Sequence, residues 1–252
     1  MSQSPQLHEI SQVIRPDAGS ELVLVCEHAS PYIPASLNGL GLAEADLLSH
    51  AAWDPGAFAV ARRMSRSLDA VLVASGVSRL VYDCNRPPVA PDAMPTQSER
   101  IRVPGNAGLD AQARADRVRS YYEPFRADLA RMLTTRRAPV IVTLHSFTPV
   151  FDGVRREVEI GVLHDSDARL ADAMLGVAAV QGRWNVQRNA PYGPQDGVTH
   201  TLKEHALPGG HLNVMIEIRN DLIESDDQQA SMAEVLSDWL RRALSEMRGG
   251  TA

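Results

Sequence analysis

Short apolar runs alternate with longer amphipathic segments along most of this chain. The runs are rich in Val and Ile and are bounded by polar or turn residues, which is typical of buried strands. We expect strands at Glu21–Cys26, Ala70–Ala74, Leu80–Tyr82, Val140–Leu144, Val158–Leu163 and Asn213–Ile218. We expect helices at Pro55–Leu68, Ala111–Thr135, Ala168–Val180 and Gln228–Met247. Pro124 should kink or split the second of these helices. Strands that alternate with helices predict an α/β fold with a mixed, mainly parallel sheet and helices on both faces.

The chain reads as one domain, because no internal repeat and no low-complexity linker divides its 252 residues. Two segments lack any periodic pattern. The first, 87–108, is rich in proline, and the second, 189–210, contains the turn-forming sequences Asn-Ala-Pro-Tyr-Gly-Pro and Pro-Gly-Gly. Loops of this length inside a compact domain are usually functional or disordered. We therefore predict a single domain, 1–252, with two long active-site loops.

The charge balance narrows the classes of partner. The chain has 31 Asp+Glu against 25 Lys+Arg, a formal net charge of −6. This argues against a nucleic-acid or anionic-membrane binder, which needs a basic surface. Lys203 is the only lysine, so a phosphate-loop or Schiff-base lysine is not expected elsewhere. Genomic base composition explains most of the arginine excess, but the planar guanidinium also suits the binding of carboxylates.

The cysteines and the N-terminus suggest a compartment. Cys26 and Cys84 are too few for a disulfide framework and lie within apolar runs, so we expect buried free thiols in a reducing environment. The first residues lack the basic-then-apolar order of a signal peptide, and no apolar run reaches the length of about 18 residues that a membrane span needs. We therefore expect a cytoplasmic protein. Its oligomeric state does not follow from the sequence.

Polar side chains follow several of the predicted strands at the point where each strand ends. They are Glu27-His28, Asp83-Cys84-Asn85-Arg86, His145-Ser146 and, within the last strand, Glu217 and Arg219. In open α/β sheets, ligands bind at the carboxyl ends of the strands. Burying one ionisable group without a partner costs several kcal/mol. These side chains should therefore satisfy one another, a metal ion or a substrate.

Each of these residues also has a purely structural interpretation. A histidine after a strand is often a hydrogen-bonded core residue, and Asn85-Arg86 before Pro87 is compatible with a simple turn. Glu217 could pair with Arg219, although residues two apart on a strand share a face without close contact.

If the strand ends converge, two imidazoles and one carboxylate supply three ligands for Zn²⁺. A further carboxylate nearby could act as a general base, and an arginine could bind a substrate carboxylate through both its nitrogens. These parts predict metal-assisted hydrolysis of an amide bond in an acidic substrate.

The sequence resembles the N-formylglutamate amidohydrolase (N-formylglutamate deformylase) family, which is related in fold to the zinc carboxypeptidases and aspartoacylase. The matching segments are 27–30 with 33–34, 53–57, 78–87, 144–146 and 217–219. The most specific of them is the block Ser-Arg…Asp-x-Asn-Arg-Pro, at 78–87. The resemblance implies a zinc-carboxypeptidase-like (phosphorylase/hydrolase-like) fold and one Zn²⁺ per chain.

The resemblance also implies roles for individual residues. His28 and His145 resemble the metal-binding histidines of zinc carboxypeptidases, and Glu217 resembles their general base. Asn85 and Arg86 resemble the pair that binds the substrate carboxylate, and we expect Arg79 and Arg219 to assist them. The carboxypeptidase pattern has an acidic ligand three residues after the first histidine, where this chain has a proline. Asp54 is our choice for the third ligand, with Glu27 as the alternative.

The resemblance implies hydrolysis of N-formyl-L-glutamate, or of a related N-acyl acidic amino acid, to the free amino acid and formate or the corresponding acid. Two other functions remain open from the sequence. One is a carboxypeptidase-like peptidase or amidase acting on small peptides. The other is a non-catalytic protein that binds small acidic ligands.

Overall fold

A seven-stranded sheet organises the part of the chain that the computed structural model describes, residues 9–249. Its strands, in spatial order, are β1 (Ser11–Ile14), β3 (Val71–Ser75), β2 (Leu22–Cys26), β6 (Val140–Phe147), β11 (Asn213–Arg219), β9 (Ile160–Leu163) and β10 (Val186–Arg188). The pairings of β2 with β3, β2 with β6, β6 with β11 and β9 with β10 are parallel. The edge strand β1 and the pair β9–β11 are antiparallel. The prediction of a mixed, mainly parallel sheet is confirmed.

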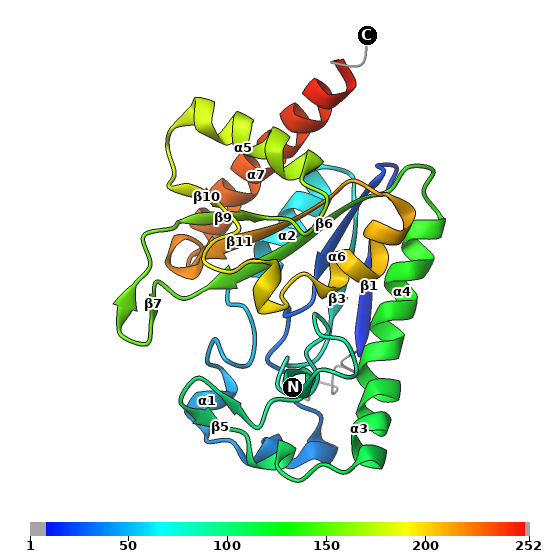
Figure 1. The fold of residues 1–252 in the computed structure, drawn as a ribbon, viewed down its shortest axis with the longest axis vertical. Coiled ribbons are helices and arrows are strands. Elements are labelled where there is room, and N and C mark those ends of the chain that lie inside the picture. Colours follow the sequence, from blue (N-terminus) through cyan, green and yellow to red (C-terminus); the bar gives the residue numbers. More distant parts are fainter. Residues whose placement is uncertain (1–8, 250–252) are drawn as a thin grey trace, which may run out of the picture.

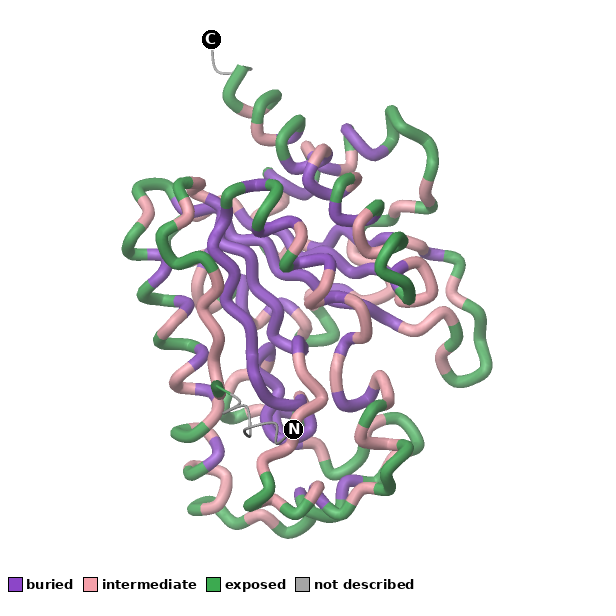
Figure 2. The backbone as a smooth tube through the Cα atoms, turned by 180° about the vertical axis from the view of Figure 1, so that it is seen from behind, coloured by how far each residue is buried: buried purple, intermediate pink, exposed green. Residues whose placement is uncertain are grey.

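Helices cover both faces of this sheet (Figure 1). One face packs against α2 (Ala57–Ser67), α5 (Arg169–Gln181) and α7 (Asp226–Gly249). The other packs against α4 (Glu123–Thr134) and α6 (His200–His205). The central strands are buried along their whole length, as Figure 2 shows, because both faces are covered. Continuous apolar runs in the sequence, with no alternation, follow from this double coverage.

The helix predicted at Ala111–Thr135 is interrupted as expected. It consists of α3 (Ala111–Arg117), a wider π-type turn at Val118–Tyr122, and α4. Pro124 lies in the first turn of α4. Proline has no N–H to donate to the preceding turn, and the wider turn accommodates its ring.

Glycine is required at the start of α2. Gly56 has a φ of 81°, and a Cβ atom there would lie 2.6 Å from the carbonyl oxygen of Ile223. Only glycine combines a left-handed backbone with so close an approach. The turn brings the residues before α2, including Asp54, under the carboxyl ends of β2 and β6.

One predicted strand is wrong. Residues 80–82 form a turn in which Leu80 N–H donates to Ser78 Oγ and Val81 N–H donates to the Ser78 carbonyl. The apolar character of this run has another cause, because Leu80 and Val81 are buried in a small separate core with Leu40. Apolar runs of this length do not distinguish a strand from a buried loop.

The short elements were not predicted from the sequence. They include the sheet edges β1 and β10, the helix α1 (Glu44–Leu47), and two small hairpins. The hairpins are β4–β5 (Gln97–Ser98 and Ile101–Arg102) and β7–β8 (Val150–Phe151 and Val154–Arg155). Segment 189–210 is not entirely a loop, because it contains α6. A helix of six residues is too short to show a clear apolar periodicity.

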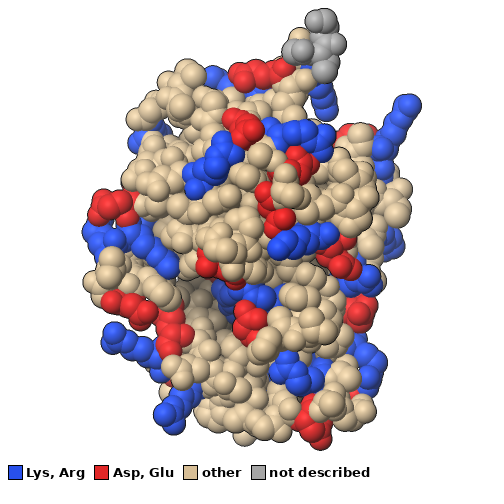
Figure 3. Space-filling view, in the orientation of Figure 1, with Lys and Arg blue, Asp and Glu red and all other residues tan. Residues whose placement is uncertain are grey.

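Among the described residues, no helix has both the length and the apolar character that crossing a membrane requires. Acidic and basic side chains are interspersed on the face shown in Figure 3. Both cysteines are buried and unpaired, as expected.

Candidate metal and active site

A cavity of about 500 Å³ opens at the carboxyl end of the parallel strands. Its walls come from the ends of β2, β6 and β11, from segment 78–99, and from the loop that contains Tyr192. A parallel arrangement brings the carboxyl ends of these strands to the same edge of the sheet, where ligand sites of α/β proteins lie. The position of the cavity agrees with the clustering of polar residues that the sequence shows.

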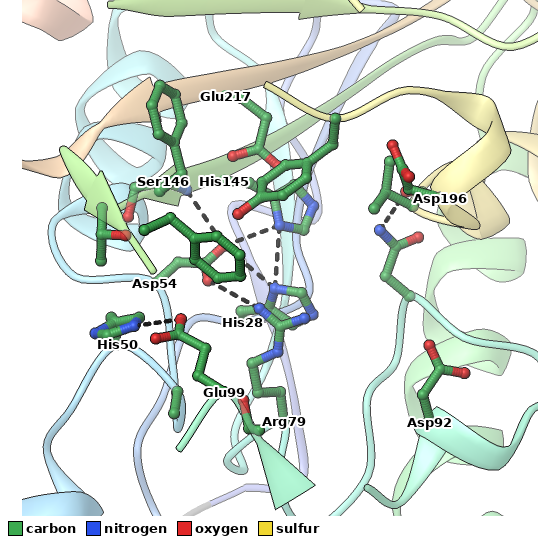
Figure 4. Close-up of a pocket in the computed structure, with 18 of the residues that line it drawn as sticks. His28, His50, Asp54, Arg79, Asp92, Glu99, His145, Ser146, Asp196 and Glu217 are labelled. Atoms are coloured by element: carbon green, nitrogen blue, oxygen red, sulfur yellow. Dashed lines mark hydrogen bonds and ion pairs between the residues drawn. The ribbon is translucent and has the colours of Figure 1, made fainter. Parts of the chain in front are cut away.

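Three side chains converge at the base of this cavity (Figure 4). Asp54 Oδ2 lies 2.9 Å from His145 Nδ1 and 3.2 Å from His28 Nδ1, and the two Nδ1 atoms are 3.1 Å apart. One ligand atom from each residue lies within 4.8 Å of the other two. All three side chains are buried.

Backbone contacts hold Asp54 in this position. The Asp54 N–H donates to the His28 carbonyl at 3.0 Å, and the Ser146 N–H donates to Asp54 Oδ2 at 3.2 Å. The Ser146 hydroxyl donates to the carbonyl of Pro55 at 2.8 Å. The segment that carries Asp54 is thereby joined to the ends of both β2 and β6.

The outer nitrogen of each histidine faces a second carboxylate. His28 Nε2 lies 2.7 Å from Asp83 Oδ1. His145 Nε2 lies 3.0 Å from Glu27 Oε2, although this contact is an ion pair that does not satisfy hydrogen-bond angles. Each imidazole is therefore placed between the convergent cluster and a buried acid.

Glu217 completes the base of the cavity. In the parallel pairing of β11 with β6, Glu217 is in register with His145. Its Oε2 atom is buried and has no hydrogen-bond partner within the described chain. Burial raises the pKa of Glu217 to about 7; His145 opposes this rise and Asp54 adds to it. A carboxyl group with such a pKa can accept and return a proton near neutral pH.

Space beside Glu217 depends on Gly161 of the neighbouring strand. Gly161 is in register with Glu217, and a Cβ atom on it would lie 2.1 Å from the Ala190 carbonyl oxygen. Glycine therefore lets the loop that carries Tyr192 approach the sheet closely. Tyr192 lines the cavity, where burial, and then the charge of Glu217, raise its pKa.

Mutual attraction stabilises the charged forms of this cluster. Burial alone would raise the pKa of Asp54 and of Asp83. His28 and His145 outweigh this effect at Asp54, and His28 and Arg79 outweigh it at Asp83, so both pKa values are lowered. Burial lowers the pKa of His28 and His145, yet the surrounding carboxylates raise both above the usual value. The site therefore favours additional positive charge, whether it comes from protons or from a cation.

A divalent metal ion fits this donor set. Two imidazole nitrogens and one carboxylate oxygen are the protein ligands of many catalytic zinc sites. Here they are supplied by His28, His145 and Asp54, and two further buried carboxylates neutralise added charge from behind the imidazoles. Of the two acids that the sequence left open, Asp54 lies in the cluster, whereas Glu27 lies on the far side of the His145 ring.

Arg79, Asn85 and Arg86 also line the cavity. Arg79 donates to Asp83 Oδ2 at 3.0 Å and lies 3.5 Å from Asp54 Oδ1, with 30% of its side chain exposed. Burial alone would lower the pKa of Arg79, but these two acids raise it. The guanidinium group therefore remains charged at the edge of the metal-ligand cluster.

Arg86 and Asn85 connect the two long loops. Arg86 Nε donates to Asp92 Oδ2, in segment 87–108, at 2.6 Å. Its Nη1 donates to the carbonyl of Gly197, in segment 189–210, at 3.1 Å. The side-chain oxygen of Asn85 accepts from the Thr201 N–H at 3.1 Å. Asn85 and Arg86 thus combine a place in the cavity wall with a role in loop attachment.

Arg219 does not join the site. Its buried guanidinium lies 2.8 Å from Asp221 and 3.6 Å from Glu159, and it is not part of the cavity wall formed by the described residues. The expectation places Arg219 beside the substrate carboxylate. Its side chain instead pairs with Asp221, two residues along the chain, and with Glu159, just before β9.

The sequence did not reveal an aromatic wall. Phe147, Phe151 and Tyr192 all line the cavity, and the Arg156 guanidinium lies 5.5, 4.5 and 4.9 Å from their ring centres. Arg156 therefore joins rings from three separate segments by cation–π contacts. Scattered aromatic residues have no spacing that predicts such a wall.

A second unforeseen contact lies at the cavity edge, where His50 Nε2 is 2.7 Å from Glu99 Oε1 (Figure 4). Glu99 comes from the tip of the β4–β5 hairpin, in the first predicted active-site loop. No motif marks His50 in the sequence; its place in the cavity wall follows from this contact with the hairpin.

Comparisons with known proteins identify the family and the fold. The model of the N-formylglutamate amidohydrolase family matches residues 20–224. No curated protein matches the chain. The structure of a gene product from Agrobacterium tumefaciens is 52% identical, with a TM-score of 0.93 over 95% of this chain and 96% of that one. An N-formylglutamate amidohydrolase from Ralstonia eutropha JMP134 is 18% identical and shares the fold, with a TM-score of 0.68 over 95% and 98% of the two chains. Because the family model covers most of its length, this chain belongs to the N-formylglutamate amidohydrolase family.

Proposed function

We propose that this protein is a zinc-dependent amidohydrolase that converts N-formyl-L-glutamate and water to L-glutamate and formate, or cleaves the same bond in a related N-acyl acidic amino acid. The observation that carries the proposal is the convergence of His28, Asp54 and His145 beside Glu217 in one cavity. Family membership supports amide hydrolysis as the reaction.

His28, Asp54 and His145 are the residues that would hold the metal ion. Zinc bound by such a set polarises a substrate carbonyl and makes a water molecule more acidic. Glu217 takes the proton from the attacking water, because its pKa of about 7 lets it change protonation state near neutral pH. It then delivers that proton to the leaving nitrogen, so that the amine departs neutral.

Arg79 and Arg86 bind the substrate carboxylates in this proposal. Both line the cavity, and a guanidinium group can donate two parallel hydrogen bonds to a carboxylate. Arg79 lies next to the metal-ligand cluster through Asp54, whereas Arg86 lies at the junction of the two loops. Binding at these two positions would orient the scissile amide relative to Glu217.

The test is a hydrolysis screen with N-formyl-, N-acetyl- and N-succinyl-L-glutamate, with zinc content measured on the same protein sample. We expect formate release from N-formyl-L-glutamate that is lost on chelation and restored by zinc. Failure to release formate with or without added zinc would exclude this substrate. Full activity in protein shown to be free of metal would exclude the mechanism.

A second candidate is an amidase that acts on small peptides or on bulkier N-acyl amino acids. The cavity of about 500 Å³ and the aromatic wall of Phe147, Phe151 and Tyr192 favour it, because apolar and aromatic walls accommodate larger ligands. Faster turnover of N-benzoyl amino acids or dipeptides than of N-formyl-L-glutamate would support this candidate. A Phe151→Ala variant should then slow the bulkier substrates selectively.

A further inference from the structure

Glu27 lies directly behind one of the convergent histidines. Its Oε2 is 3.0 Å from His145 Nε2, whereas His145 Nδ1 faces Asp54 and His28. The two nitrogens of an imidazole point in divergent directions, so the ring separates Glu27 from the cluster. Glu27 is therefore not positioned to share a metal ion with the other three residues.

The same relation occurs at the other histidine. Asp83 Oδ1 lies 2.7 Å from His28 Nε2, and it also accepts from the Asn85 N–H at 2.9 Å. Each Nδ1 thus points into the cluster (Figure 4), and each Nε2 points at an acid. A carboxylate at Nε2 favours the tautomer with its proton there, which leaves the Nδ1 lone pair free for a cation.

Glu27 is buried against His145. Its side chain is 1% exposed, and its ion pair within the described chain is with His145. A buried ion pair often stabilises a fold no more than apolar side chains of the same volume, although removing one partner alone is costly. The histidine is the group that benefits from this carboxylate.

The position follows from strand pairing. Val25 of β2 is in register with Thr143 of β6, and continuing that register by two residues brings Glu27 beside His145. Glu217 lies in register with His145 on the opposite side, in β11. His145 therefore has one acid on either side, Glu27 from the turn directly after β2 and Glu217 from β11.

We propose that Glu27 is a positioning residue that holds His145 in the ring orientation and tautomer required for metal binding, and that Asp83 does the same for His28. This inference rests on the proposed metal-dependent function. It assigns Glu27 to the histidine and not to the metal ion.

The experiment measures zinc affinity by chelator competition for the wild type, Glu27→Gln and Glu27→Leu. Removing an acid behind a metal-binding histidine typically weakens metal binding about 10- to 100-fold. We expect the order wild type, Glu27→Gln, Glu27→Leu, because glutamine keeps an oxygen acceptor at Nε2 and leucine has none. X-ray absorption of the zinc-loaded Glu27→Gln protein should show the same ligand set as the wild type.

Thermal unfolding of the metal-free proteins separates positioning from folding. Both variants remove one partner of the buried Glu27–His145 ion pair, so both should unfold below the wild-type temperature by a similar amount, whereas their zinc affinities should differ. Glu204→Gln is the matched control, because Glu204 pairs with Arg126 on the surface of α6 and should leave zinc affinity unchanged. Asp83→Asn tests the parallel role at His28 and should also weaken zinc binding.

Several outcomes would overturn the inference. Wild-type zinc affinity in Glu27→Leu, with wild-type hydrolysis intact, would overturn it and leave the proposed function standing. Loss of one oxygen ligand in Glu27→Gln would show that Glu27 is itself a ligand. A fall in unfolding temperature that parallels the loss of affinity would show a structural role. If the wild type binds no zinc and hydrolyses none of the substrates, the proposed function and this inference both fail.

Discussion

At the carboxyl ends of the central strands, the two faces of the sheet differ in chemistry but not in burial. In β6, Leu144 is 0% exposed and His145 is 1% exposed, although they are adjacent. Leu144 belongs to the core under α2, α5 and α7, whereas His145 points to the opposite face, into the cluster with Asp54. The same change occurs between Cys26, the last residue of β2, and Glu27-His28 directly after it.

The difference teaches that burial has two consequences in this fold. On the apolar face, each buried side chain contributes stability roughly in proportion to the area that it buries. At the carboxyl ends, burial shifts pKa values and brings like charges together, which costs stability. Polar residues that remain buried under those conditions mark a site, and substitutions on the two sides of this boundary should separate stability from activity.

The largest effect is expected for His145→Ala, which removes one metal ligand of the proposed site. Because several kcal/mol of transition-state stabilisation would be lost with the metal ion, kcat/KM should fall about a thousandfold or more. Steady-state kinetics and zinc analysis on the folded fraction check this. Wild-type-like activity in this variant would contradict the mechanism.

Glu217→Gln should lower kcat about 10²- to 10⁴-fold, the usual contribution of a general base. The amide occupies the same space but cannot accept the proton from water. Because Glu217 is not one of the proposed metal ligands, zinc content should be unchanged. Kinetics at saturating substrate measure the loss. A change confined to KM would instead indicate a role in binding.

Leu144→Ala tests the apolar side of the boundary. Leu144 is fully buried, so truncation should lower the free energy of unfolding by about 2–5 kcal/mol. At a temperature where the variant remains folded, kcat/KM per folded molecule should stay close to wild type. Denaturant titration and kinetics on one sample provide the comparison with His145→Ala. An equal loss of activity in both variants would contradict the difference between the two faces.

The pH dependence follows from Glu217, whose pKa burial raises to about 7. Only the ionised carboxylate accepts a proton, so kcat/KM should rise about tenfold per pH unit on the acid side and then level off. The midpoint should lie at or below about pH 7, because a bound cation favours the ionised form. A profile of the same shape in Glu217→Gln would assign the transition to another group.

As pH rises, the raised pKa of Glu217 increases activity but lowers stability. Between the ordinary glutamate pKa and about 7, the folded protein retains a proton that the unfolded chain releases. The contribution of Glu217 to the free energy of unfolding therefore falls as pH rises through this window. Denaturant titrations of metal-free protein should show Glu217→Gln gaining stability relative to wild type as pH increases. A constant difference across the window would contradict the raised pKa.

The smallest effect is expected for Arg86→Lys. Lysine keeps the charge but cannot donate two parallel hydrogen bonds to a carboxylate, so KM should rise about tenfold with little change in kcat. Thermal unfolding provides the control, because Arg86 also holds Asp92 and the Gly197 carbonyl. An unchanged KM would remove Arg86 from substrate binding.

Much of the fold could be predicted because its central elements are long and fully buried. The runs at β2, β3, β6, β9 and β11 are continuous and apolar, and the amphipathic helices between them are distinct. Short elements such as β10 and α6 span too few residues for a period to show. The strand prediction at Leu80–Tyr82 is wrong because a buried turn requires the same apolar residues as a buried strand.

The sequence by itself determined the α/β fold class and the gathering of His28, His145 and Glu217, since the ends of parallel strands meet at one edge of a sheet. Only the tertiary structure decided which acid faces which nitrogen. It placed Asp54 in the cluster and Glu27 behind His145, and it directed Arg219 toward Asp221 and Glu159. The physical reason is that strand-end placement follows from local burial, whereas the position of Asp54 and the ion pair of Glu27 with His145 depend on contacts between segments far apart in the chain.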